Sequence, residues 1–248
     1  MAQRRRIRVR AIVCGRTKLA EQDQILTLLA EDGQQMRAVA KGARKPGSRL
    51  AARTDLCCEC DLLLSLGPGL AVVGEAELIR AYGAGADLSR LSCASAMAEI
   101  ARMTSFEDNP DPFLFPLLAR ALASVGEAAD EAHLSLALAA YALKVCSHEG
   151  WRPRTRRCVL CGEPHSGAFS AQAGGALCAS CAKDVAGVEV TGTDAIEWLE
   201  ALVTSTFDTL MALDADAAFS AYLAELAVGW ARTHLECRLR ACEFYLGL

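Results

Sequence analysis

Apolar and polar residues change their spacing along this chain, and the changes divide it into regions. Over residues 7–82, apolar residues recur at every second position or in short runs, as in strands. The stretch QILTLLAEDGQQMRAVAKG predicts two strands joined by an Asp-Gly turn at 32–33, and LLLSLGPGLAVV predicts two more joined at 66–69. Five strands in about eighty residues predict a small Greek-key barrel of the OB type, with an SH3-like barrel as the alternative.

The apolar spacing becomes helical over residues 87–148 and again from residue 191 onward. Predicted helix starts are Asp111-Pro112, Asp130, and Thr193 or Asp194, and a last helical stretch covers residues 217–246. The first two helices are apolar on most sides, so we expect them to lie inside a bundle.

These patterns predict an α+β multidomain protein in which a β-barrel precedes an α-helical domain with an inserted four-cysteine zinc finger. The predicted segments are a barrel at 1–82, helical parts at 83–152 and 191–248, and the insertion at 153–190.

Composition and charge narrow the class of protein. Hydrophobic residues make up 52% of the chain, which excludes a disordered protein. The most apolar run, 134–143, is too short to span a bilayer, and the N-terminus lacks a signal-peptide core, so we expect a bacterial cytoplasmic protein without membrane contact. The net charge of −4 is uneven: residues 1–80 carry 14 Lys and Arg against 9 Asp and Glu, and the remainder carries 12 against 21. A polyanion contact is therefore expected at the N-terminal end.

Two Cys-x-x-Cys pairs, Cys158 with Cys161 and Cys178 with Cys181, are separated by sixteen residues. This spacing is typical of a structural zinc site, because a tight turn, here beside glycines, aims both sulfurs of a pair at one metal. Four protein ligands leave no open position for activating water. An iron–sulfur cluster and a redox-active dithiol are the alternatives.

Other candidate ligands are predicted to be structural. His165 lies between the two pairs and is interpreted as a surface residue. A strand would point Cys58 and Cys60 to one face and Cys57 to the other, so these three are expected to be small buried residues.

Residues 41–53, which we call the basic segment, carry no carboxylate and five cations: Lys41, Arg44, Lys45, Arg49 and Arg53. The Pro-Gly pair at 46–47 predicts a mobile loop. Such a loop favours contact with a phosphate backbone, although a solubilising loop is the alternative. The three tryptophans lie outside the barrel, which favours backbone contact over base stacking.

Two other arginine runs have similar alternatives. The run at 4–10 adds cations near the barrel or forms an ordinary strand with outward arginines. The run at 152–157 contacts phosphate or is a solvated charged stretch.

Catalytic patterns are missing from the sequence. It has no Walker-type phosphate loop, no His-Glu-x-x-His and no Gly-x-Ser-x-Gly. His133 and His234 occur singly in helical stretches and are interpreted as partly buried polar residues, and the Asp residues near 108–111 and 214–216 as helix caps. We therefore predict no catalytic residues and no enzyme.

With these segments identified, the chain resembles the RecO family of bacterial recombination mediators over nearly its full length. The resemblance rests on CGRTKLAEQDQILTLLAEDGQQMRAVAKGARKPGSR, LLLSLGPGLAVVGEAEL, EGWRPRTRRCVLCG and HLECRLRACEFYL, with AKGARKPGSR as the most specific part. The chain departs from the family at LAARTDLCCEC, where a Gln-Pro-containing segment is common, and in its acidic overall charge.

The resemblance implies an OB barrel, a helical domain and a zinc finger. It also implies binding of single- and double-stranded DNA, annealing of complementary strands, contact with RecR and with the acidic C-terminal tail of single-stranded DNA-binding protein, and loading of RecA without ATP. By motif match it implies zinc ligands at the four paired cysteines and DNA contacts at Lys41, Arg44, Lys45 and Arg49. The tail pocket is expected on the helical domain, apolar with a basic rim, for which Arg102 and Arg120 are candidates.

Two alternative classes of function remain open from the sequence. A zinc-ribbon scaffold that binds protein or RNA partners would show no salt-dependent DNA affinity. An enzyme with a metal–thiolate site would hold its metal with fewer than four sulfurs.

Overall fold

A computed structural model describes residues 5–82 and 87–248 and divides the chain into two compact units, 1–126 and 127–248. The expected boundary after residue 82 adjoins 83–86, which lie outside the described residues, as does Arg4. The four-segment division therefore stays a prediction, and the two units are described separately.

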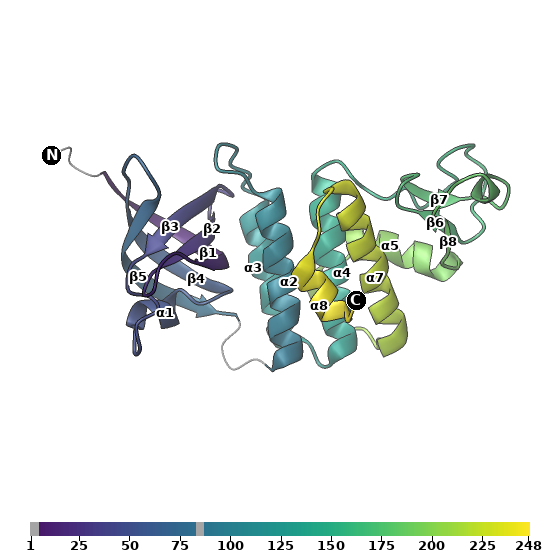
Figure 1. Cartoon of the computed structure of the whole chain (residues 1–248). Helices are drawn as coiled ribbons and strands as arrows, with labels where there is room; N and C mark the ends of the chain where they lie inside the picture. Colours follow the sequence, from purple (N-terminus) through teal and green to yellow (C-terminus); the bar gives the residue numbers. More distant parts are fainter. Residues whose placement is uncertain (1–4, 83–86) are drawn as a thin grey trace. The chain divides into compact units, whose positions relative to one another are not determined.

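The first unit begins with five strands that form a closed barrel in the order β1-β2-β3-β5-β4 (Figure 1). The strands are β1 (Arg6–Lys18), β2 (Gln24–Ala30), β3 (Gln35–Ala40), β4 (Cys58–Ser65) and β5 (Ala71–Ala81). Neighbouring strands are antiparallel except β3 and β5, which run parallel. Both turns predicted from the sequence connect antiparallel partners, so both are confirmed.

The barrel interior is filled by residues from alternate positions, as the period of two requires. It includes Ala11, Val13, Leu26, Leu28, Ala38, Cys60, Leu62 and Leu64. Residues 11–15, in the middle of β1, are buried on both faces, and Cys57 on this side donates its thiol to the carbonyl of Ala94 at 3.5 Å. Helix α2 (Leu88–Thr104) therefore covers one side of the barrel.

Gly33, in the turn between β2 and β3, has a φ of 83° and packs against the chain at Asp111. A Cβ atom here would lie 1.7 Å from the Asp111 carbonyl oxygen, so Gly33→Ala forces two backbone segments apart. We expect the free energy of unfolding to fall by about 3 kcal/mol or more, measured by urea unfolding. Gly47→Ala is the matched control, because its φ of 71° is similar but nothing lies within 4 Å. We expect it to cost about 1–2 kcal/mol, and equal losses would contradict the packing argument.

Two shorter elements complete the first unit, α1 (Arg49–Arg53) and α3 (Leu114–Glu127). The predicted start of α3 at Pro112 is too early, since the Leu114 amide donates to the Asp111 carbonyl and Pro116 occupies the first turn. The buried residues of α3 lie along one face, so it is amphipathic rather than enclosed, contrary to expectation.

The second unit is built on two long helices, α4 (Glu131–His148) and α7 (Ala217–His234), which pack along each other (Figure 1). Most of α4 is buried, as its apolar sequence predicts. Asp130 accepts from the His133 amide at 3.1 Å and caps α4, which confirms the predicted start. The remaining helices are α5 (Thr193–Thr204), α6 (Phe207–Met211) and α8 (Arg240–Leu246).

Two helix predictions in this unit are wrong. The cap of α5 is Gly192 with no side-chain bond, so Thr193 and Asp194 are the first helical residues instead. The predicted last helix is broken into α7 and α8, and Glu236 in the break has a φ of 49°.

The paired cysteines lie in an insertion between α4 and α5, which we call the cysteine module (residues 153–190). It contains a small sheet of order β7-β6-β8 and one short 3₁₀ helix. Its elements are β6 (Ala168–Ser170), β7 (Gly175–Leu177), η1 (Cys181–Lys183) and β8 (Glu189–Val190).

Candidate metal centre and candidate nucleic-acid interface

The four paired cysteines meet at one point in the cysteine module. The sulfur atoms of Cys158, Cys161, Cys178 and Cys181 all lie within 4.8 Å of one another, and those of Cys161 and Cys178 are 3.6 Å apart. A tetrahedral zinc site with bonds of about 2.3 Å has sulfur–sulfur edges of about 3.8 Å. The cluster therefore has the dimensions and donor atoms of a four-thiolate metal site.

Backbone N–H groups stabilise the negatively charged form of two of these sulfurs, those of Cys158 and Cys178. The Cys181 amide donates to the Cys178 sulfur at 3.4 Å. Burial alone would raise the pKa of Cys158, but nearby backbone N–H groups, including that of Cys178, lower it to about 6. The backbone N–H of Cys181 likewise lowers the pKa of Cys178, whereas the neighbouring thiol of Cys178 raises the pKa of Cys181 to about 12. A bound metal cation would stabilise all four sulfurs as thiolates, so that none of them needs to keep a proton. The four cysteines therefore fit a metal site.

The other candidate ligands do not join the cluster. His165 is not among the grouped residues, as predicted, and its Nδ1 accepts from the Gly167 amide at 3.4 Å. Cys58 and Cys60 are buried in the barrel core and Cys57 on the opposite side, also as predicted. Within residues 5–82 and 87–248, the paired cysteines are the one group with metal-ligating geometry.

The basic segment is anchored to the barrel, which corrects the expectation of a mobile loop. Ala43 is buried in the barrel core, and the Gly42 amide donates to Asp23 at 2.7 Å. The Arg44 guanidinium donates to the carbonyls of Ala20 and Glu21, both at 3.0 Å. The end of the segment is helix α1 rather than loop.

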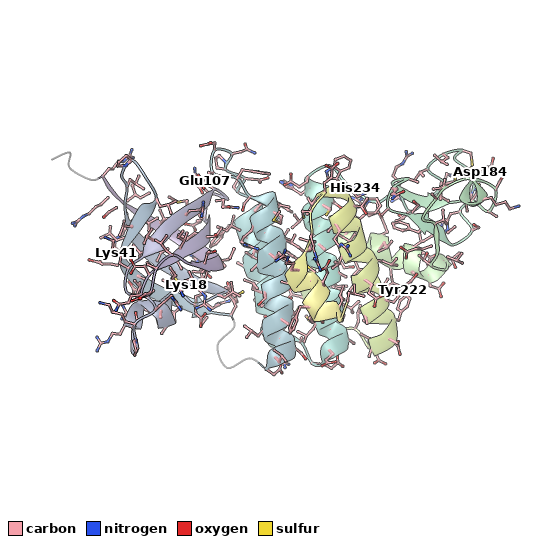
Figure 2. All side chains as sticks on the ribbon, viewed as in Figure 1. Lys18, Lys41, Glu107, Asp184, Tyr222 and His234 are labelled. Atoms are coloured by element: carbon pink, nitrogen blue, oxygen red, sulfur yellow. The ribbon has the colours of Figure 1, made fainter. Side chains whose placement is uncertain are left out.

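These anchors divide the five predicted cations into two groups. Arg44 and Arg53 are partly engaged within the fold, since Arg53 also donates, to the Ala76 carbonyl on β5 at 3.0 Å. Lys41, Lys45 and Arg49 are exposed, and their side chains have no ion pair or hydrogen bond among the described residues (Lys41 is labelled in Figure 2). These three remain available to an anion.

Lys18 belongs to the same end of the barrel, although sequence reasoning did not select it. The strand register pairs Lys18 with Gln24, and Gln24 with Ala40, the residue before Lys41. Lys18 is exposed at the end of β1 (Figure 2). Strand pairing, which a single sequence does not give, brings it beside the basic segment.

The arginines on β1 contribute less free charge than their number suggests. Arg10 forms an ion pair with Glu59, a carboxylate only 3% exposed that also accepts from the Tyr82 hydroxyl at 2.8 Å. Arg8 lies 3.5 Å from Asp61 and 3.8 Å from Glu75. This part of the run is therefore an ordinary strand with outward, paired arginines.

The two helical histidines, and two of the aspartates noted in the sequence, make structural contacts. His133 contacts Asp130 through Nδ1 at 2.6 Å and the Leu213 carbonyl through Nε2 at 3.0 Å. His234 stacks on Trp151 with ring centroids 4.9 Å apart. Asp111 accepts from the Phe113 amide and Asp216 caps α7. No helix among the described residues has the length and apolarity needed to cross a membrane.

Comparisons with known proteins found similarity along both units of the chain. The family model described as "Recombination protein O N terminal" matches residues 1–82, and "Recombination protein O C terminal" matches residues 85–242. A protein named DNA repair protein RecO from Bifidobacterium adolescentis is 35% identical over 93% of this chain and 95% of its own length. Proteins of the same name from Frankia casuarinae and Streptomyces coelicolor are 34% and 33% identical over 94% of this chain and 95% and 96% of theirs.

Proposed function

Because the chain belongs to the RecO family of DNA repair proteins, we propose that it is a recombination mediator that binds DNA and anneals complementary strands. It binds single- and double-stranded DNA, acts with RecR, and promotes loading of RecA onto strands coated by single-stranded DNA-binding protein, without ATP. The observation that carries this proposal is the family match along both units. We place the activity in the bacterial cytoplasm, at the nucleoid.

The proposed mechanism is electrostatic rather than catalytic. Two DNA strands repel each other through their phosphates, and cations held between them lower that repulsion until bases pair. The proposed contacts are Lys41, Lys45 and Arg49, with Arg44 and Arg53 also facing the phosphates at the base of the segment. The barrel, which we assign to the OB type, holds these cations at fixed positions on one end.

We assign a structural zinc ion to the four paired cysteines. A bound zinc ion would cross-link the two Cys-x-x-Cys pairs of the cysteine module and leave no ligand position for a substrate. The contribution of this site is therefore the shape of the second unit.

The acidic tail of single-stranded DNA-binding protein requires a surface that is both apolar and basic. We propose a cavity in the first unit, which we call the proline pocket. Its lining is Arg10, Glu31, Arg80, Tyr82, Pro112, Phe115, Pro116, Ala119, Arg120 and Ala123. Arg120 is thus kept as a rim residue. Arg102 is no longer a candidate for the rim, because its side chain packs against β1 at Gly15, where an added Cβ would lie 2.9 Å from the Arg102 Cδ.

Fluorescence annealing of two complementary strands coated by the cognate single-stranded DNA-binding protein tests the proposal. We expect this chain to accelerate pairing without ATP, and the acceleration to disappear when the acidic tail of the coating protein is deleted. Folded, metal-loaded protein that gives no acceleration would instead favour the scaffold function, in which the chain binds protein or RNA partners without annealing.

A further inference from the structure

Four arginines in the second unit line a single cavity. This unit, residues 127–248, carries 9 Lys and Arg against 16 Asp and Glu, yet four of its cations lie within six consecutive residues. The cavity, which we call the arginine cavity, is lined by Arg152, Pro153, Arg154, Thr155, Arg156, Arg157 and Glu200. Only one of the unit's sixteen acidic residues therefore faces it.

The cysteine module fixes the backbone of this cavity. The Arg154 amide donates to the Gly174 carbonyl at 3.2 Å, and the Arg154 carbonyl accepts from the Ala176 amide at 2.8 Å. Gly175 permits this approach, since a Cβ there would lie 2.1 Å from the Arg154 oxygen. The backbone of Arg154 is thus held beside the strand that leads directly into the second cysteine pair, Cys178 and Cys181.

Glu200 neutralises part of the arginine cavity and leaves the rest charged. Its carboxylate accepts from Arg152 at 2.7 Å and from the Thr155 hydroxyl at 3.1 Å, and lies 3.9 Å from Arg156. The Arg156 side chain is nevertheless 88% exposed.

The other two arginines have no acidic partner among the described residues. Arg157 donates to the Gly162 carbonyl at 3.0 Å, and Arg154 forms no ion pair with any residue in 5–82 or 87–248. Four guanidinium groups against one carboxylate leave a surplus of three positive charges.

The lining points to phosphate groups as the ligand. An acidic peptide with apolar side chains needs an apolar floor such as that of the proline pocket, whereas four of the seven residues that line the arginine cavity are arginines. Guanidinium forks match phosphate oxygens in pairs. Trp151, one residue before the run, is 48% exposed and held by its stacking on His234, so it presents an aromatic surface on which a base can stack.

We propose that the arginine cavity is a second DNA-binding site, which holds a second single strand while the basic segment holds the first. This inference rests on the proposed function, because annealing requires one protein to bring two strands together. It gives the cysteine module a specific task, which is to hold Arg154 and its neighbours in place.

The test is second-strand capture by the full-length protein. One oligo(dT) strand is immobilised, the protein is bound to it, and a labelled oligo(dT) strand is added; the two strands cannot pair, so only protein can hold the second. We expect Arg154→Glu with Arg156→Glu to lower capture about fivefold or more, while first-strand affinity stays within about twofold of the unchanged protein. Glu200→Gln should increase capture, because it frees Arg152 and Arg156.

Controls separate the site from net charge and from folding. Lys183→Glu with Arg240→Glu makes the same change in charge at positions outside the cavity and should preserve capture. Arg154→Lys with Arg156→Lys should restore most of it, with zinc content and melting temperature confirming the fold of each variant.

Three outcomes would overturn the inference without touching the proposed function. They are unchanged capture by the Arg154→Glu, Arg156→Glu variant, an equal loss of first-strand binding, and binding of an acidic peptide in place of the second strand. Failure of the proposed function is separate: unchanged protein would then neither anneal coated strands nor bind the first strand.

Discussion

Reversing two charges on the barrel, Lys41→Glu with Lys45→Glu, is expected to weaken single-stranded DNA binding about 25-fold at 0.1 M salt. Each phosphate contact on a single strand contributes about 0.7 to the slope of log affinity against log salt, so two lost contacts remove about 1.4 from that slope. The slope is the sharper measurement, because it counts contacts independently of the starting affinity. Fluorescence anisotropy between 0.05 and roughly 0.3 M salt measures the affinity over a range in which it depends strongly on salt.

The two lysines are chosen because nothing in the fold depends on their charge. Both are exposed and without a partner among the described residues. Arg44 is a poorer choice, since its guanidinium donates to the carbonyls of Ala20 and Glu21 and its reversal would release the segment. A loss of affinity in an Arg44 variant would therefore mix DNA contact with local structure.

Lys41→Arg with Lys45→Arg is the matched control, and it should keep both affinity and salt slope. Lys183→Glu with Arg240→Glu should also leave first-strand affinity near that of the unchanged protein, which excludes an effect of net charge. Unchanged affinity and slope in the Lys41→Glu, Lys45→Glu variant would show that the basic segment is the solubilising loop that the sequence left as an alternative.

The elements set by local pattern could be predicted from the sequence. Alternating residues gave the barrel strands, the turns at 32–33 and 66–69 gave their connections, and cysteine spacing alone gave the cluster that the fold assembles. In each case the physical cause lies within a few neighbouring residues, such as the φ of 83° that Gly33 adopts in its turn.

The features that could not be predicted from the sequence depend on contacts between residues that are distant in the chain. Glu59 pairs with Arg10 across neighbouring strands, and Arg44 reaches the β1–β2 connection, so the segment around each cation does not reveal that its side chain is already engaged. The arginine cavity is a similar case. Its arginines were visible as a run, but only the fold places Glu200 as the single acid among them.

Removing one ligand of the cysteine cluster, by Cys161→Ser, is expected to abolish stoichiometric zinc binding and unfold the cysteine module. The module's own apolar cluster is small, with Cys158, Ala168 and Leu177 as its buried members, whereas Phe169 packs instead against Trp230 of α7. Structural zinc binds small domains with about 10–16 kcal/mol, far more than such a core can supply. A zinc-release dye and hydrogen exchange over residues 153–190 measure the two effects. Ser180→Ala is the control, because Ser180 lies between two ligands without capping η1.

Chelation of the unchanged protein should separate the two proposed DNA sites. Arg154 depends on the module through its bonds to Gly174 and Ala176, whereas the basic segment is anchored within the first unit. Metal removal should therefore reduce second-strand capture at least as strongly as Arg154→Glu with Arg156→Glu, while first-strand affinity and its salt slope persist. A chelated protein with a protected module would contradict the structural metal, and visible absorption lost on chelation would identify an iron–sulfur cluster in place of zinc.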